Sequence, residues 1–114
     1  MKWITTSTKP LSANESYIGR KIKSAKYRKY EDTLLTTLPD LVVSEDGLLH
    51  LRLLVRYSNK RSDIDNCLKP FIDVLQKRYD FNDNRIYRLT VKKEIVAKGE
   101  EGITFNLEDY EIKK

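Results

Sequence analysis

The sequence contains few of the residues that cross-link small proteins or bind phosphate through backbone loops. Its 114 residues include one cysteine, Cys67, which excludes an intrachain disulfide and a multi-cysteine zinc site. Four scattered glycines leave no glycine-rich phosphate loop, and we expect no small-molecule cofactor. No stretch approaches the roughly 20 apolar residues of a membrane span, and the first residues lack the apolar core of a signal peptide. We therefore expect a protein of the reducing cytoplasm that does not associate with membranes.

Charged residues, by contrast, are abundant, and the positive ones are unevenly distributed. There are 22 lysines and arginines against 17 acidic residues, which gives a net charge of +5. A basic balance favours a polyanionic partner, although a solvated helix face is the simpler explanation of a basic run. One stretch without acidic residues carries six of the cations: Arg20, Lys21, Lys23, Lys26, Arg28 and Lys29.

The hydrophobic pattern predicts one α+β domain that spans residues 1–114. Alternating apolar residues predict strands, and apolar residues three and four apart predict helices. The predicted elements are strands at 3–6, 49–57, 86–96 and 103–110, helices at 24–38 and 66–79, and a hairpin connection at 98–102. This strand-helix-strand-helix-strand-strand order favours a mixed sheet with helices packed on one face. The single histidine, His50, alternates outward on its strand, and we expect it to be exposed.

The segment between the second predicted strand and the second predicted helix is the most informative part of the chain. Asp63 and Asp65 are two residues apart, so in extended chain both carboxylates project to the same side. Asp65 also stands where it could cap the helix, and Lys69 follows it by four residues, on the same helical face. Asp83 occupies the turn after the helix, from which an antiparallel return could bring it close to the other two.

Most of these residues also have a purely structural explanation. Asp65 could serve only as a helix cap, Lys69 as an ion-pair partner, and Asp83 as a turn residue. Asp63 is harder to explain, because a second carboxylate beside a capping one adds repulsion. Three neighbouring carboxylates on a basic protein would be costly unless a cation is bound.

A divalent cation that prefers oxygen ligands, Mg²⁺ or Mn²⁺, would relieve this repulsion. Such ions activate water and neutralise the charge that develops on phosphate during phosphodiester hydrolysis. An acidic cluster in a basic protein is therefore what a nuclease requires, although an aspartate pair alone is common. A calcium-binding EF-hand beginning at Asp80 is excluded, because Arg85 replaces the required glycine and Val91 the bidentate glutamate.

Two motifs resemble those of the RusA family of Holliday junction resolvases. One is the run Asp63-Ile64-Asp65-Asn66-x-x-Lys69-x-x-x-Asp73-x-Leu75, followed by Asn82-Asp83. The other is the opening Pro10-Leu11-Ser12-Ala13-Asn14 with Tyr17, which is similar to the family's P-x-S-x-N segment before a basic stretch. The resemblance covers about residues 1 to 110, with both motifs in the family's order.

The resemblance implies a metal-dependent endonuclease that acts as a homodimer on four-way DNA junctions in recombination and repair, typically encoded by phages and prophages. Its paired nicks leave ends that a ligase can seal. It assigns catalysis to Asp63, Asp65, Asp83 and Lys69, with the three aspartates as metal ligands. Two positions depart from the family pattern: Ser62 replaces a basic residue, and Tyr79-Asp80 stands where a glycine often follows the helix.

We expect DNA contacts from the cations of the basic stretch and from two that precede the aspartates. The predicted DNA-binding residues are Arg20, Lys21, Lys23, Lys26, Arg28, Lys29, Lys60 and Arg61. Two alternatives stay open at this point. One is a nuclease specific for forks or flaps, and the other is a basic DNA-binding module without catalysis, in which the acids only cap and turn the chain.

Overall fold

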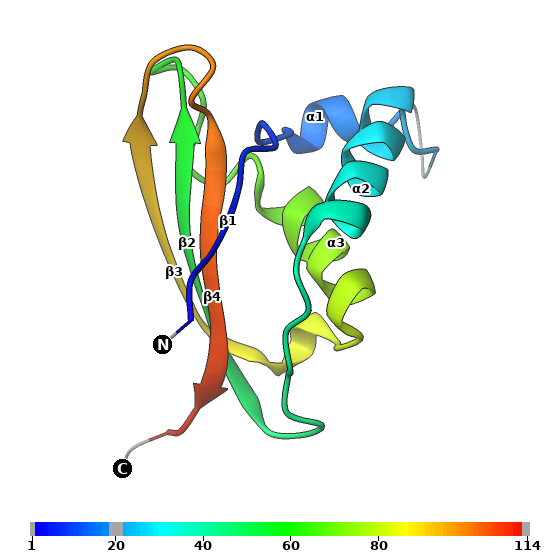
Figure 1. Cartoon of the computed structure of the whole chain (residues 1–114), viewed down its shortest axis with the longest axis vertical. Coiled ribbons are helices and arrows are strands. Elements are labelled where there is room, and N and C mark those ends of the chain that lie inside the picture. Colours follow the sequence, from blue (N-terminus) through cyan, green and yellow to red (C-terminus); the bar gives the residue numbers. More distant parts are fainter. Residues whose placement is uncertain (1, 19–21, 113–114) are drawn as a thin grey trace.

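The computed structural model describes residues 2–18 and 22–112 and has helices on one face of a four-stranded mixed sheet (Figure 1). In chain order the elements are β1 (Ile4–Thr6), α1 (Ala13–Ser16), α2 (Ala25–Thr37), β2 (Leu48–Tyr57), α3 (Leu68–Tyr79), the 3₁₀ turn η1 (Asp83–Arg85), β3 (Ile86–Ile95) and β4 (Gly102–Tyr110). The predicted α+β class, the mixed sheet and the placement of the helices on one face are confirmed. Among the described helices, none has the length and apolar character needed to cross a membrane.

The strand order is β1-β4-β2-β3, so the predicted hairpin between the last two strands is wrong. β2 lies between them, parallel to β3 and antiparallel to β4. The connection from β3 to β4 therefore crosses the end of β2 (Figure 1). β2 takes the central position because it has the longest apolar alternation in the chain. In that position it is hydrogen-bonded along both edges and covered by the helices.

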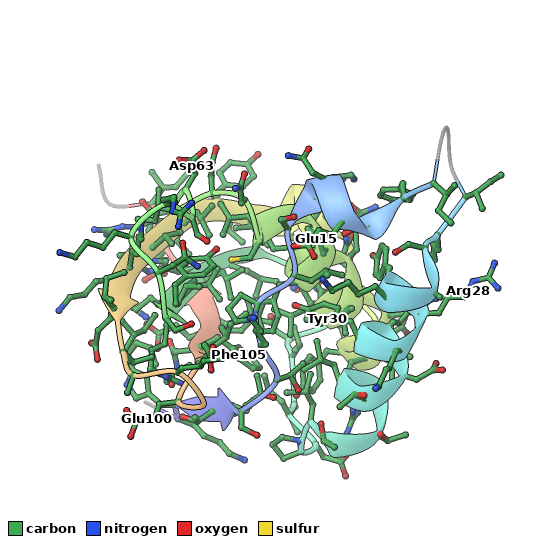
Figure 2. The ribbon with its side chains drawn as sticks, turned by 90° about the horizontal axis from the view of Figure 1, so that it is seen from above. Glu15, Arg28, Tyr30, Asp63, Glu100 and Phe105 are labelled. Carbon is green, nitrogen blue, oxygen red and sulfur yellow. The ribbon has the colours of Figure 1, made fainter. Side chains whose placement is uncertain are left out.

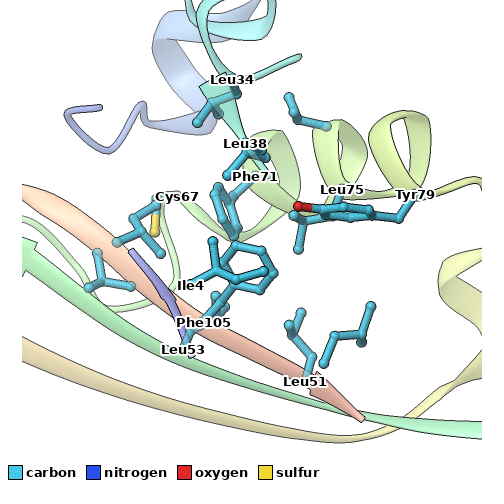
Figure 3. Packing of buried hydrophobic residues seen from close by; sticks show 14 of the residues in the cluster. Ile4, Leu34, Leu38, Leu51, Leu53, Cys67, Phe71, Leu75, Tyr79 and Phe105 are labelled. Atoms are coloured by element: carbon cyan, nitrogen blue, oxygen red, sulfur yellow. The ribbon is translucent and has the colours of Figure 1, made fainter. Parts of the chain in front are cut away.

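The core fills the space between the sheet and the helices. Phe71 of α3 and Phe105 of β4 are both fully buried, and their ring centroids lie 5.5 Å apart in an edge-to-face arrangement (Figure 3). Leu34 of α2, Leu75 of α3 and Leu51 of β2 are also fully buried in this cluster. Burial of side chains of this size contributes about 1.5–3 kcal/mol each, so the packing of β2 and α3 in this core fixes both ends of the segment that carries Asp63 and Asp65.

His50 lies on the sheet face that no described helix covers, yet only 4% of it is exposed. Its Nε2 lies 2.8 Å from the Thr90 hydroxyl, and its ring packs edge-on against Tyr110. Burial lowers the pKa of His50, and the neighbouring guanidinium groups of Arg52 and Arg88 lower it further. The expectation that His50 is exposed is therefore wrong, because side chains of β3 and β4 cover it from both sides.

The observed helix ends match the ends predicted from the sequence at some positions and differ from them at others. Ser24 caps α2 by accepting a 3.0 Å hydrogen bond from the N–H of Tyr27, as the predicted start implies. The short helix α1 lies between the first predicted strand and the first predicted helix, where the sequence predicted no helix or strand. Its sequence signal is the pair Ser12 and Glu15 at capping-box spacing. Asp80 ends α3 with φ +52°, the left-handed conformation that a glycine would adopt most easily.

Candidate active site

Asp63 and Asp65 occupy a turn between the end of β2 and the start of α3. The carbonyl oxygen of Asp63 accepts a 3.2 Å hydrogen bond from the Asn66 N–H, and that of Asp65 accepts one of 3.1 Å from Leu68. These bonds use only the backbone, and both side chains are exposed. The buried hydroxyl of Tyr57 donates a 3.4 Å hydrogen bond to the Asp63 carbonyl oxygen. Burial raises the pKa of Tyr57, a hydrogen bond with Cys67 adds to this, and the carboxylates of Asp65 and Asp63 raise the pKa further. The structure thus brings these two predicted site residues together.

Asp65 does not cap α3, so that structural explanation is wrong. The helix begins at Leu68, two residues later than predicted, with Cys67 at the capping position and no side-chain capping hydrogen bond. Asp65 belongs to the turn at residues 64–67, in which Asn66 and Cys67 separate it from the first helical residue. The carboxylate of Asp65 is therefore not used for capping.

The two motifs of the sequence meet in space at this turn. The backbone N–H of Ala13, the first residue of α1, donates a 2.8 Å hydrogen bond to the carbonyl oxygen of Asn66. α1 is in turn tied to the start of α2, because the Ser24 hydroxyl donates a 2.7 Å hydrogen bond to the Glu15 carbonyl. Residues more than 50 positions apart in the sequence thus form one continuous surface.

Lys69 belongs to a polar stripe along α3, as the helical spacing predicts. Its side chain is 70% exposed, and its Nζ lies 3.6 Å from a carboxylate oxygen of Asp73. The Gln76 amide donates a 3.3 Å hydrogen bond to the other oxygen of Asp73. The ionic partner of Lys69 is therefore Asp73 rather than Asp65, and a helical surface pair of this kind contributes only a few tenths of a kcal/mol.

Asp83 lies beyond the opposite end of α3 from the aspartate pair. Its N–H donates a 2.8 Å hydrogen bond to Oε1 of Gln76, in the last turn of that helix. The 12 residues of α3 rise by about 18 Å along the helix axis. Within residues 2–18 and 22–112, no group of three or more His, Cys, Asp or Glu side chains is placed to hold a metal ion. The structure therefore does not gather the three predicted metal ligands within one chain.

A metal site made from Asp63 and Asp65 alone is chemically reasonable. Mg²⁺ usually keeps several waters and binds proteins through one or two carboxylates, with substrate phosphates completing its octahedron. Two exposed carboxylates in one turn match that ligand set. Asp83 does not fit it in the geometry of a single chain.

The predicted DNA-binding residues have different surroundings. Arg20 and Lys21 lie outside the described residues. Lys23 forms a 2.9 Å ion pair with Glu31, and Lys26 pairs with Glu15. The other four are exposed, and none has a carboxylate partner among the described residues: Arg28, Lys29, Lys60 and Arg61.

The two groups of cations also lie on different parts of the surface. Viewed from above, Arg28 and Asp63 lie at well-separated edges of the molecule (Figure 2). Lys60 and Arg61, in contrast, belong to the loop that leads directly into Asp63. Among the predicted DNA-binding residues that the structure describes, only these two flank the aspartate pair.

Lys93 is a cation beside the site that the sequence did not indicate. Its Nζ donates hydrogen bonds to the carbonyl oxygens of Ser62 and, at 3.2 Å, Lys60, and it lies 5.9 Å from the ring centroid of Tyr57. It thus fastens the loop before Asp63 to β3. The pairing of β3 with β2 creates this contact, so no local pattern around Lys93 could reveal it.

Comparisons with known proteins do not identify the chain. It matches no protein-family model, and no curated protein sequence matches it. The functional argument therefore depends on the aspartate turn, on Lys69 and on the surface around them.

Proposed function

We propose that this protein is a metal-dependent endodeoxyribonuclease that resolves four-way DNA junctions by paired nicks. One observation carries the proposal: the hydrogen bond from Ala13 to Asn66 joins the two motifs at a turn with two exposed carboxylates, and Lys69 is the second residue of the helix that follows this turn. A surface of this kind, in a chain with net charge +5, suits a phosphodiester substrate that needs a cation at the scissile phosphate.

In this proposal Asp63 and Asp65 hold Mg²⁺ or Mn²⁺. The bound ion supplies activation of water and neutralisation of charge on the phosphate. Lys69 is largely exposed, and Asp73 is its only ion-pair partner among the described residues, so it supplies a fixed positive charge toward the phosphate or the leaving oxygen. Lys60 and Arg61 bind the DNA backbone next to the cleaved bond. Lys93 positions the loop by holding its carbonyl groups against the sheet.

The resemblance supplies the rest of the proposal: a homodimer acting on junctions in the cytoplasm of a bacterial host, encoded by a phage or prophage. Two-fold symmetry suits a junction, whose matching strands can meet two identical sites. A nuclease that prefers forks or flaps has the same chemistry and is distinguished only by its substrate.

The deciding experiment compares cleavage of synthetic four-way junctions, forks, flaps and duplexes in Mg²⁺, Mn²⁺ and EDTA. We expect symmetric nicks in the junction that require the metal. Asp63→Asn should abolish nicking while junction binding persists or tightens, because the repulsion of phosphate decreases. Asp46→Asn is the matched control. The exposed Asp46 precedes the opposite end of β2, so this variant should cleave the junction normally. Metal-dependent cleavage that Asp63→Asn leaves intact would refute the assignment.

A non-catalytic DNA-binding module is the second candidate. It is favoured by the observation that the described residues contain no group of three metal-ligating side chains. This candidate predicts junction binding that does not respond to divalent metal, and no nicking by the wild-type protein under any of these conditions.

A further inference from the structure

A small cleft lies between the loop that precedes α1, the helix α1 itself and α2. The loop contributes Lys9, Pro10 and Leu11 to its lining, α1 contributes Glu15, and α2 contributes several residues that include Tyr30. The volume of the cleft is about 270 Å³. Sites for drug-sized ligands typically have roughly 300–1,000 Å³, so this cleft suits a smaller group.

The segments around the cleft are held together by polar contacts and by the core. Lys26 of α2 forms an ion pair with Glu15 of α1. The N–H of Ser24 donates a 2.9 Å hydrogen bond to the carbonyl oxygen of Ser16, which ties the start of α2 to the end of α1. Leu11 is buried in the hydrophobic core and anchors the loop. The cleft is therefore preformed, and a ligand would have few groups to order on binding.

The lining combines apolar groups with an excess of positive charge. Pro10, Leu11 and Tyr30 supply apolar surface, while three lysines and one glutamate give the lining a net charge of +2. Lys9 and Lys29 are exposed, and neither has a carboxylate partner among the described residues. A ligand that matches this lining carries an apolar, preferably planar, group and an anionic group next to it. A nucleotide has both.

The cleft also lies between the aspartate turn and the basic stretch. Viewed from above, Glu15 lies between Asp63 and Arg28 (Figure 2). The hydrogen bond from Ala13 to Asn66 joins α1 directly to the aspartate turn. A DNA strand that contacts both the turn and the cations of α2 would therefore pass over the cleft. This position favours a nucleotide over an acidic peptide as the occupant.

We propose that the cleft binds one unpaired nucleotide of a DNA strand. The phosphate lies beside Lys9 and Lys29, and the base packs against Pro10 and Tyr30. A base inside a duplex is stacked and paired and does not enter such a cleft, so the cleft selects DNA with an unpaired position. The inference takes DNA as the partner from the proposed function, and it adds recognition of an unpaired base at a second site beside the aspartate turn.

Titration with deoxyadenosine monophosphate in EDTA tests the cleft without any cleavage step. We expect saturable NMR shifts of the backbone amides of residues that line the cleft, such as Lys9, Leu11 and Thr33. Deoxyadenosine lacks the phosphate and deoxyribose phosphate lacks the base, so each should bind about tenfold more weakly. A single-stranded oligonucleotide should compete with the nucleotide better than the matching duplex does.

Two threonines of α2 provide a matched pair of variants. Both are exposed, and the hydroxyl of each donates to a backbone carbonyl four residues earlier, but Thr33 lines the cleft and Thr36 does not. Thr33→Glu should weaken binding of the nucleotide about tenfold, because it places a negative charge near the phosphate. Thr36→Glu should leave binding unchanged. Lys9→Ala should weaken binding about threefold, with Lys98→Ala as its control in the exposed connection after β3.

The possible outcomes separate this inference from the proposed nuclease. Absence of binding, shifts that lie outside the cleft, or normal binding by Thr33→Glu would overturn the inference. Inorganic phosphate or a glutamate-rich peptide that binds the cleft as tightly as the nucleotide would also overturn it. A protein that binds the nucleotide but does not nick junctions contradicts the proposed function alone. Nicking by a protein that does not bind the nucleotide contradicts this inference alone.

Discussion

The backbone N–H of Asp83 donates a 2.8 Å hydrogen bond to the side-chain oxygen of Gln76. The amide of the same Gln76 donates to Asp73, which in turn pairs with Lys69. A chain of polar contacts thus runs along α3 from Lys69 to Asp83. These polar contacts connect Lys69 with Asp83, while the carboxylate of Asp83 stays separated from Asp63 and Asp65.

This arrangement predicts unequal effects of the aspartate substitutions. Asp63→Asn and Asp65→Asn should each abolish metal-dependent cleavage, because each removes half of the proposed ligand set. Asp83→Asn should retain measurable cleavage, because Asp83 lies beyond the far end of α3. Single-turnover rates on a synthetic junction at several Mg²⁺ concentrations provide the comparison. Equal loss in all three variants would place Asp83 at the metal, either through rearrangement or through a second chain.

Lys69→Met should separate catalysis from stability. The side chain of Lys69 is largely exposed, and its ion pair with Asp73 is a surface pair along a helix. Such a pair contributes about 0.3–0.5 kcal/mol, so the free energy of unfolding should hardly change. Loss of a fixed positive charge near the phosphate should lower the cleavage rate at least about a hundredfold. Lys98→Met, in the exposed connection after β3, is the control that should cleave normally.

Much of the fold follows from local pattern. The alternation from Leu49 to Tyr57 predicts β2, and the apolar spacing around Leu34 predicts a helix at 24–38, close to the bounds of α2. Which strands pair with each other does not follow from local pattern. The pairing depends on which strand buries the most apolar surface by lying at the centre of the sheet. The short connection at 98–102 is typical of a hairpin, yet β3 and β4 lie on either side of β2. The burial of His50 follows from that same pairing.

The residues of the candidate site could be proposed from the sequence, but their arrangement in space could be predicted only in part. The spacing of Asp63 and Asp65 indicates two carboxylates that share one location, and the structure places both residues in the turn between β2 and α3. The position of Asp83 depends on how the chain returns after α3, which local spacing does not determine. The contact of Lys93 with the loop depends on the register between β2 and β3, which the sequence does not encode locally.

Glu31 gives the protein an acid-dependent contribution to stability. Burial by itself would raise the pKa of Glu31, but hydrogen bonds from Lys77 and Lys23 outweigh it, and the pKa is lowered from its usual 4.5. A carboxyl whose pKa is lower in the folded state stabilises the fold above the unfolded pKa. That stabilisation is lost as the pH falls through the folded value. Glu31→Gln should therefore cost about 1 kcal/mol at neutral pH, and the difference from wild type should shrink below about pH 4.5.

Urea denaturation of both proteins from pH 7 to about pH 3 measures this difference. Glu45→Gln is the control, because the exposed Glu45 has no ion-pair partner among the described residues. The free energy of unfolding of that variant should differ little from that of wild type. A gap for Glu31→Gln that stays constant or widens on acidification would contradict the predicted role of Lys23 and Lys77.

The salt dependence of junction binding should distinguish the paired from the unpaired cations of the basic stretch. Lys23 and Lys26 already neutralise Glu31 and Glu15, whereas Arg28 and Lys29 have no carboxylate partner among the described residues. Each phosphate contact that is lost reduces the slope of log K against log salt by about 0.9. Arg28→Ala with Lys29→Ala should therefore reduce the slope by about 2 if both bind phosphate.

Lys23→Ala with Lys26→Ala removes the same formal charge from the same stretch, which makes it the matched comparison. We expect it to change the slope less, because a lysine held by a carboxylate releases few counterions from DNA. It should instead lower the free energy of unfolding, since Glu31 and Glu15 lose partners. Equal slopes for the two double variants would mean that total charge, rather than the pairing of individual side chains, determines how this surface binds DNA.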